Sequence, residues 1–146
     1  MIFITHKLYD GVQIDSGWER RAEREWKCRE EIYRRYIEVI SPMLPTTVRR
    51  LCTQGIHDAK VESVVQKKDS LCFVLDTSGA LGAFRGGRVR LVFSGLRRRI
   101  PTRGLRGQWW LYEEAHLSHR ARFSLHVMFN QSDVEIEADE LLVKKV

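Results

Sequence analysis

The sequence predicts an α+β fold, with a long N-terminal helix and a short second helix packed on an antiparallel meander sheet of roughly five to seven strands. Two observations support this prediction. Apolar residues recur at helical spacing in residues 1–54, whereas residues 55–146 alternate with a period of two between short turn sequences. Helices followed by strands with short connections are typical of antiparallel α+β proteins. A chain of 146 residues has room for one core, so we expect a single domain, 1–146.

The long helix is predicted to begin at Ser16 and to end before Pro42. Ser16 and Glu19 have the spacing of a capping box. An apolar stripe follows at steps of three and four residues: Trp18, Ala22, Trp26, Tyr33, Tyr36, Ile37 and Ile40. Proline disfavours helix in the residue before it and donates no hydrogen bond, so Pro42 and Pro45 stop the helix. Residues 2–8 alternate weakly, which predicts a short strand or an irregular arm.

A short second helix and a series of strands come next. Thr46 or Thr47 can cap a helix that runs to about Gln54 and ends at Gly55, which suits the left-handed closing position. Alternating segments then predict six strands and a further extended piece: 61–65, 71–76, 89–93, 109–116, 121–130, 134–138 and 140–146. The connection at 94–108 is much longer than the others, and a long loop in a small domain invites a functional explanation.

Positive charge is concentrated in one segment, residues 85–106. The formal net charge of the chain is +6. The segment contains no acidic residue and eight arginines: Arg85, Arg88, Arg90, Arg97, Arg98, Arg99, Arg103 and Arg106. The other 17 Lys and Arg residues are outnumbered by 19 acidic residues, so the positive excess is local.

The arginine-rich loop is the predicted binding site. Guanidinium groups form bidentate hydrogen bonds with carboxylates and phosphates. The predicted partner-binding residues are the loop arginines and two neighbouring tryptophans: Arg97, Arg98, Arg99, Arg103, Arg106, Trp109 and Trp110. We expect an acidic protein partner. Nucleic acid is the alternative, because the tryptophans could stack on bases. A third interpretation is that the arginines only keep an exposed loop hydrated.

His57 and Asp58 stand at the entrance to the predicted sheet and raise the question of a metal or acid-base site. Metal-dependent hydrolases with an adjacent His-Asp pair need further ligands at helical spacing. No such spacing is found among the other histidines: His6, His116, His119 and His126. We therefore expect structural roles, in which Asp58 caps backbone N–H groups and His57 forms a hydrogen bond nearby. A metal site and a contact with a partner are the alternatives.

Glu113 and Glu114 are adjacent on a predicted strand, so their side chains point to opposite faces and cannot act as a pair. One of them can point into the protein, where a buried carboxylate needs a hydrogen-bond donor, and Glu114 is assigned a structural polar role. His116 and His126 could face each other on neighbouring strands, but the sequence identifies no third or fourth metal ligand.

Other patterns argue against cofactors and membranes. Three widely spaced cysteines predict reduced thiols without a metal. The sequence has no phosphate-binding loop and no dinucleotide motif, so no cofactor is expected. No apolar run approaches the roughly 20 residues that cross a bilayer, and no signal peptide is recognised. These features predict a cytoplasmic protein.

Short motifs run along the sheet-forming half of the chain and its N-terminus. They are MIFITHKLY at 1–9, HD-x-x-V-x-x-V at 57–64, L-x-F-x-L-D at 71–76, V-x-L-x-F at 89–93, G-Q-W…Y-E-E at 107–114 and F-x-L-x-V-x-F at 123–129. Together they resemble an uncharacterised family of bacterial domains of unknown function, over roughly residues 1–9 and 45–140. The resemblance implies a shared fold and no particular activity. The His-Asp opening has a looser similarity to small immunity proteins that neutralise bacterial toxins.

The sequence therefore predicts a non-enzymatic protein-binding domain of the immunity type, which neutralises a bacterial toxin through the arginine-rich loop and a sheet face. The alternative is a nucleic-acid-binding module that uses residues 85–106. The third hypothesis is a small metal-dependent hydrolase at His57 and Asp58.

Overall fold

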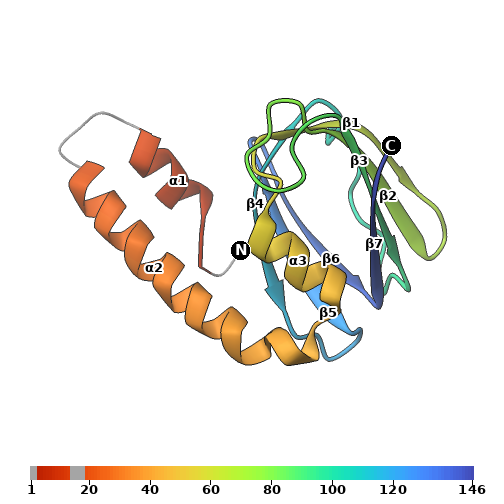
Figure 1. The fold of residues 1–146 in the computed structure, drawn as a ribbon, viewed down its shortest axis with the longest axis horizontal. Coiled ribbons are helices and arrows are strands. Elements are labelled where there is room, and N and C mark those ends of the chain that lie inside the picture. Colours follow the sequence, from red (N-terminus) through yellow and green to blue (C-terminus); the bar gives the residue numbers. More distant parts are fainter. Residues whose placement is uncertain (1–2, 14–18) are drawn as a thin grey trace.

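The computed structural model describes residues 3–13 and 19–146 and has an α+β architecture (Figure 1). Its helical elements are α1 (His6–Gln13), α2 (Glu19–Ile40), the 3-10 turn η1 (Ser41–Met43) and α3 (Thr46–Gln54). Its strands are β1 (Ala59–Gln66), β2 (Ser70–Asp76), β3 (Arg88–Ser94), β4 (Trp109–His116), β5 (Phe123–Phe129), β6 (Asp133–Ala138) and β7 (Glu140–Lys145). The strands pair antiparallel throughout one seven-stranded sheet, so the predicted fold class is confirmed. No described helix is both long enough and apolar enough to span a membrane.

The N-terminal segment differs from the prediction, because residues 6–13 form a helix where a strand or an irregular arm is expected. The first helix is therefore short, and the long helix is the second. The hydroxyl of Thr5 accepts a hydrogen bond from the N–H of Leu8 at 3.3 Å, which caps the start of α1. Ile4 and Leu8 are buried, and so short an apolar pattern does not distinguish helix from strand. The predicted capping residue Ser16 lies outside the described residues.

The sheet is not the simple meander that the sequence predicts. Its strand order is β6-β5-β4-β1-β2-β3-β7, so a three-stranded unit (β6-β5-β4) and a four-stranded unit (β1-β2-β3-β7) are joined where β1 pairs with β4. This joint is short, with Ala59 opposite Trp110 and Lys60 opposite Trp109. Strands β6 and β7 form the two edges of the sheet, although only Asp139 separates them in the chain. The sheet must therefore curl until its edges approach each other, and Figure 1 shows α3 at the opening of the curve.

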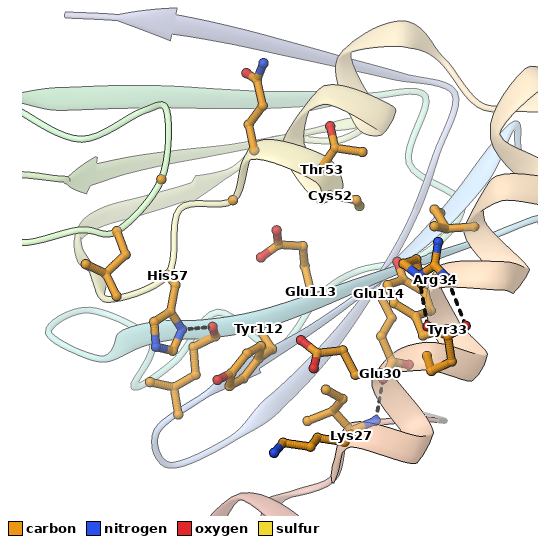
Figure 2. Close-up of a pocket in the computed structure, with 18 residues that line it drawn as sticks. Lys27, Glu30, Tyr33, Arg34, Cys52, Thr53, His57, Tyr112, Glu113 and Glu114 are labelled. Atoms are coloured by element: carbon orange, nitrogen blue, oxygen red, sulfur yellow. Dashed lines mark hydrogen bonds and ion pairs between the residues drawn. The ribbon is translucent and has the colours of Figure 1, made fainter.

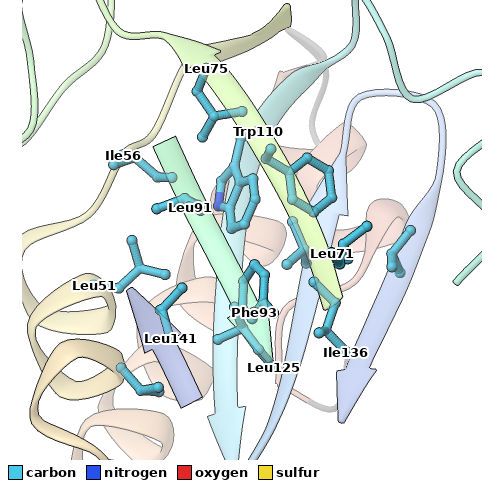
Figure 3. Close-up of a cluster of buried hydrophobic side chains, with 14 of the residues drawn as sticks. Leu51, Ile56, Leu71, Leu75, Leu91, Phe93, Trp110, Leu125, Ile136 and Leu141 are labelled. Carbon is cyan, nitrogen blue, oxygen red and sulfur yellow. The ribbon is translucent and has the colours of Figure 1, made fainter. Parts of the chain in front are cut away.

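The inner face of the curled sheet and one side of α3 form the main core (Figure 3). Every second side chain of β2 and β3 is buried, as the alternation predicts. Aromatic side chains fill the centre: Phe73, Phe93, Trp110, Phe123 and Phe129. The ring of Trp110 packs edge-on against Phe73 and Phe129, with centroids 5.8 and 5.5 Å apart. Val48 and Leu51 of α3 are fully buried in the same core.

Helices α1 and α2 lie against the outer face of β4 and β5. Leu111 and Met128 point outward because their neighbours Trp110 and Phe129 point into the core. With Ile4 they form a second buried cluster, and four aromatic rings pack around it: Phe3, Tyr9, Trp26 and Tyr112. Helix α2 thus approaches β4 from one side and α3 approaches it from the other.

Candidate functional site

A cavity of about 850 Å³ lies between α2, α3 and β4 (Figure 2). It lies beside β4 because β1 pairs with that strand at two positions only. Its polar lining comes from α2, from the end of α3 and the loop that follows it, and from β4: Lys27, Glu30, Glu31, Tyr33, Arg34, Cys52, Thr53, Gln54, His57, Tyr112, Glu113 and Glu114. Sites for small ligands and anchoring side chains have volumes of roughly 300–1,000 Å³, so the cavity has the size of a binding site.

Beyond Trp110, the side of β4 that faces β1 has no paired strand among the described residues, and two side chains form hydrogen bonds with its backbone instead. The hydroxyl oxygen of Tyr33 accepts a hydrogen bond from the backbone N–H of Ala115 at 2.8 Å. Toward the other end of the strand, the Nδ1–H of His57 donates to the carbonyl oxygen of Leu111. Main-chain groups of alternate residues point to the same side of a strand, so those of Glu113 face the cavity between these two contacts.

Glu113 is the central polar group of the cavity. A register shift between Trp110 and Tyr112 turns Glu113 to the inner face, where Trp110 also points. The Trp110 Nε1–H donates a hydrogen bond to the Glu113 carboxylate at 2.7 Å. Burial raises the pKa of Glu113 to about 7, while the indole hydrogen bond acts in the opposite direction. Among the described residues, no lysine, arginine or histidine forms an ion pair with this carboxylate.

Cys52 and Tyr33 lie beside Glu113, and Figure 2 shows Cys52 and Glu113 directed toward the same space between α3 and β4. Desolvation by burial raises the pKa of both the Cys52 thiol and the Tyr33 hydroxyl. A thiol with a raised pKa stays protonated at neutral pH, and the thiolate is the nucleophile. The cavity therefore does not favour nucleophilic catalysis by Cys52.

Glu114 points to the face opposite Glu113, as expected for adjacent strand residues. It is 1% exposed and lies beneath the N-terminal arm. Its Oε1 accepts hydrogen bonds from the backbone N–H groups of Phe3 and Ile4, at 3.0 and 2.6 Å. Glu114 therefore has the donors that a buried carboxylate needs, whereas Glu113 has the Trp110 indole as its hydrogen-bond donor.

His57 and Asp58 lie at the rim of the cavity. The His57 ring packs on Tyr112, with centroids 4.7 Å apart, and its Nε2 lies 3.5 Å from the Asp58 carboxylate. Asp58 has a positive φ of 65°, and its backbone N–H donates to the carbonyl of Trp110 at 2.9 Å. The side-chain contact of Asp58 is thus with His57, and the tight turn into β1 comes from its backbone conformation. Neither residue belongs to the metal-capable group found in the described part of the chain.

The arginine-rich loop is partly neutralised within the protein. Arg97 forms an ion pair with Asp139 at 2.7 Å, and Arg98 forms one with Glu135. The loop is also held in place, because Ile100 and Leu105 are buried in the main core. These contacts reduce the charge available to a partner, and the sequence could not show them because both carboxylates lie about 40 residues away in the chain.

The remaining predicted contact residues are not on one surface. Arg99 lines a depression over β5 and β6, whereas Arg106 lines another beside Lys60 of β1. Trp109 is 42% exposed, with Lys60 Nζ 5.7 Å from its ring centroid. Trp110 is fully buried, so its predicted contact with a partner is wrong. Adjacent residues of a strand point to opposite faces, and only one of the two tryptophans can reach the surface.

Sequence reasoning missed the cavity and the role of Tyr33. In the sequence, Tyr33 is one member of an apolar stripe, and nothing indicates that its hydroxyl caps a strand 82 residues away. Glu113 is visible only as half of a Glu-Glu pair, because a β-bulge of this kind has no reliable sequence signature.

Comparison with known proteins gives one match. The model of the family described as "Protein of unknown function (DUF4085)" matches residues 12–138, which include the long helix α2 as well as most of the sheet. No curated protein and no solved structure matches the chain. The predicted resemblance to a family of unknown function is thereby confirmed. The chain belongs to the DUF4085 family of proteins of unknown function.

Proposed function

We propose that this protein is a binding domain that accepts a basic side chain of a partner protein in the cavity between α2, α3 and β4. The observation that carries the proposal is the Glu113 carboxylate, which lines the cavity and forms no ion pair with a described basic residue. A carboxylate in partly desolvated surroundings is unfavourable unless a cation or several donors compensate it. A lysine or arginine of a partner would supply that compensation.

The surroundings of Glu113 suit a cation with an apolar stem. Glu30 of α2 adds negative charge to the cavity lining, and Tyr112 and His57 present aromatic surface. Arg34, an arginine of the cavity lining, is occupied by ion pairs with Glu31 and Glu38 of its own helix, at 2.8 Å each. A long basic side chain can bury its methylene groups in such a cavity while its charged end reaches the carboxylate.

The proposal keeps the protein-binding function predicted from the sequence and moves its centre from the arginines to the cavity. Anchor residues that fill desolvated pockets contribute much of the energy of many interfaces. Arg97 and Arg98 already have internal partners, whereas Glu113 has no described basic partner. The cavity is therefore the better supported contact site.

The binding of blocked amino acids tests the proposal. We expect N-acetyl-arginine amide and N-acetyl-lysine amide to shift the indole N–H resonance of Trp110 at millimolar concentration, because that group donates to Glu113. The neutral N-acetyl-glutamine amide should leave the resonance unchanged. Glu113→Gln should abolish the response, while Glu140→Gln, at an exposed position of β7, should retain it. Equal shifts with charged and neutral probes, or no shift with any probe, would contradict the proposal.

A second candidate function is the binding of an acidic protein, which includes an immunity-type role against a toxin. Arg99, Arg103 and Arg106 are exposed, and none of them forms an ion pair with a described residue. We expect replacement of all three by glutamate to weaken binding of a fluorescent poly-glutamate peptide at least ten-fold. Replacement of Lys67 and Lys68, in the β1–β2 turn, is the matched control. Tighter binding of a single-stranded oligonucleotide, falling steeply with salt, would favour nucleic acid instead.

A further inference from the structure

A cluster of three metal-ligating side chains lies on the outer face of β4 and β5. Glu114 and His116 are two residues apart on β4, and His126 is the β5 residue opposite Glu114. Residues i and i+2 of a strand and the cross-strand neighbour share one face, so the three side chains converge. One ligand atom from each of them lies within 4.8 Å of the others. Glu114 and His116 are buried, and His126 is 19% exposed.

Each of the three side chains is also held by a second contact. Backbone N–H groups of the N-terminal arm bind Glu114 Oε1, and its Oε2 lies 3.4 Å from His116 Nε2. The other nitrogen of that ring, Nδ1, lies 3.3 Å from the hydroxyl of Tyr36. His126 Nε2 lies 3.2 Å from Glu135 Oε1. Such outer contacts orient imidazole and carboxylate ligands in metal sites, because they fix the ring and the tautomer.

The tautomer of each histidine decides what the three side chains present to one another, and in one tautomer His116 Nε2 donates to Glu114 Oε2. When the two imidazoles donate to Tyr36 and Glu135, the second nitrogen of each ring carries a lone pair. With the carboxylate of Glu114, three acceptors then lie close together in a buried place. In that tautomeric state a cation between them could take one ligand atom from each of the three side chains.

We propose that Glu114, His116 and His126 bind a divalent transition-metal cation of the zinc type. Two imidazoles and one carboxylate form a ligand set that such ions use in proteins when they keep one position open. The 3.4 Å between Glu114 Oε2 and His116 Nε2 matches the roughly 3.3 Å that separates ligands on a tetrahedral zinc ion. The ion has a route from solvent, because His126 and Glu135 also line a surface depression of about 380 Å³.

Metal titration of the full chain tests this site. The protein is treated with a chelator, dialysed, and titrated with Zn²⁺ by calorimetry and with Co²⁺ by visible absorption. We expect one equivalent to bind, a Co²⁺ spectrum of low-coordinate geometry, and a Tm that rises with Zn²⁺ concentration, because the ion binds the folded state. His126→Gln should weaken binding at least ten-fold, and the matched control His119→Gln, in the exposed β4–β5 turn, should not.

A second variant tests the site without removing a ligand. Glu135→Gln weakens the contact that orients His126, and we expect a loss of affinity of about 10- to 100-fold. This variant decides the question if His126→Gln does not fold. The proposal is overturned if the wild-type protein binds neither ion, or if Glu135→Gln binds as tightly as the wild type and the His119→Gln control.

Discussion

Replacement of Gly82 by alanine is expected to destabilise the protein by about 3 kcal/mol or more. Gly82 has a φ of +110°, and a Cβ there would overlap the backbone carbonyl oxygen of Gln54 and lie 2.6 Å from that of Gly55. The strained backbone costs about 1–3 kcal/mol, and overpacking adds about 1–3 kcal/mol. Because both neighbours are backbone atoms at the end of α3, they cannot rotate away. Gly82 also lines the cavity, so the same change would distort it.

Substitutions at two other glycines of the β2–β3 loop separate the cost of the strained backbone from the cost of the steric overlap. Gly86 has a φ of +85°, but a Cβ there would meet no atom within 4 Å, so Gly86→Ala should cost about 1–2 kcal/mol from the backbone alone. At Gly79 a Cβ also meets no atom within 4 Å, and its φ lies outside the left-handed region, so Gly79→Ala should change stability by less than about 0.5 kcal/mol. Urea-induced unfolding measures all three. If Gly82→Ala costs no more than Gly86→Ala, the loop does not pack on α3 as described.

Glu113→Gln is expected to stabilise the protein at pH 8 and to leave its stability unchanged near pH 4. The pKa of Glu113 is raised from 4.5 to about 7, so the folded state keeps its proton while the unfolded state loses it. Stability therefore falls as pH rises from about 4.5 to 7 and then stays level. A shift of this size corresponds to about 3 kcal/mol, which partial exposure to the cavity reduces to about 1–3 kcal/mol. Glutamine cannot ionise and still accepts the indole hydrogen bond of Trp110.

Urea unfolding of both proteins from pH 4 to pH 8, in buffer with a chelator, measures the difference. Glu140→Gln serves as the control, since substitutions at exposed positions change stability by less than about 0.5 kcal/mol. A loss of stability in Glu113→Gln at pH 8 would mean that the carboxylate has a compensating partner in the folded protein. A buried carboxylate that destabilises the folded protein, such as Glu113, is typical of functional sites, where a residue is kept for binding although it lowers stability.

The periodicity of the sequence was sufficient to predict secondary structure where one face of an element is buried. Helix α3 runs from Thr46 to Gln54 and is closed by Gly55 as predicted, but its N-cap is Pro45 and no side chain caps it, so the predicted capping by Thr46 or Thr47 is wrong. Strands β2 and β3 show the predicted alternation of buried and exposed side chains. Helix α1 was missed because its apolar pattern is short, and the short N-terminal helix replaces a predicted strand or arm.

The site depends on contacts between segments that are far apart in the chain. The carboxylate partners of Arg97 and Arg98 come from β6 and the residue after it, so charge counting over residues 85–106 overestimated the charge available to a partner. The sequence predicts that His116 and His126 could face each other on neighbouring strands, whereas the register places His126 opposite Glu114 and His116 opposite Ser124. Glu114 was not recognised as their companion, because that requires the register of β4 against β5.

The sequence by itself determined the α+β class, most element positions and the alternation that builds the core, because these depend on the spacing of apolar residues along the chain. Only the tertiary structure decided the strand order, the curl of the sheet and the gap between β1 and β4. It also decided that a bulge turns Glu113 toward the cavity while Glu114 faces the two histidines. Alternation specifies the face on which a side chain lies, but neighbours and register are set by packing over the whole domain.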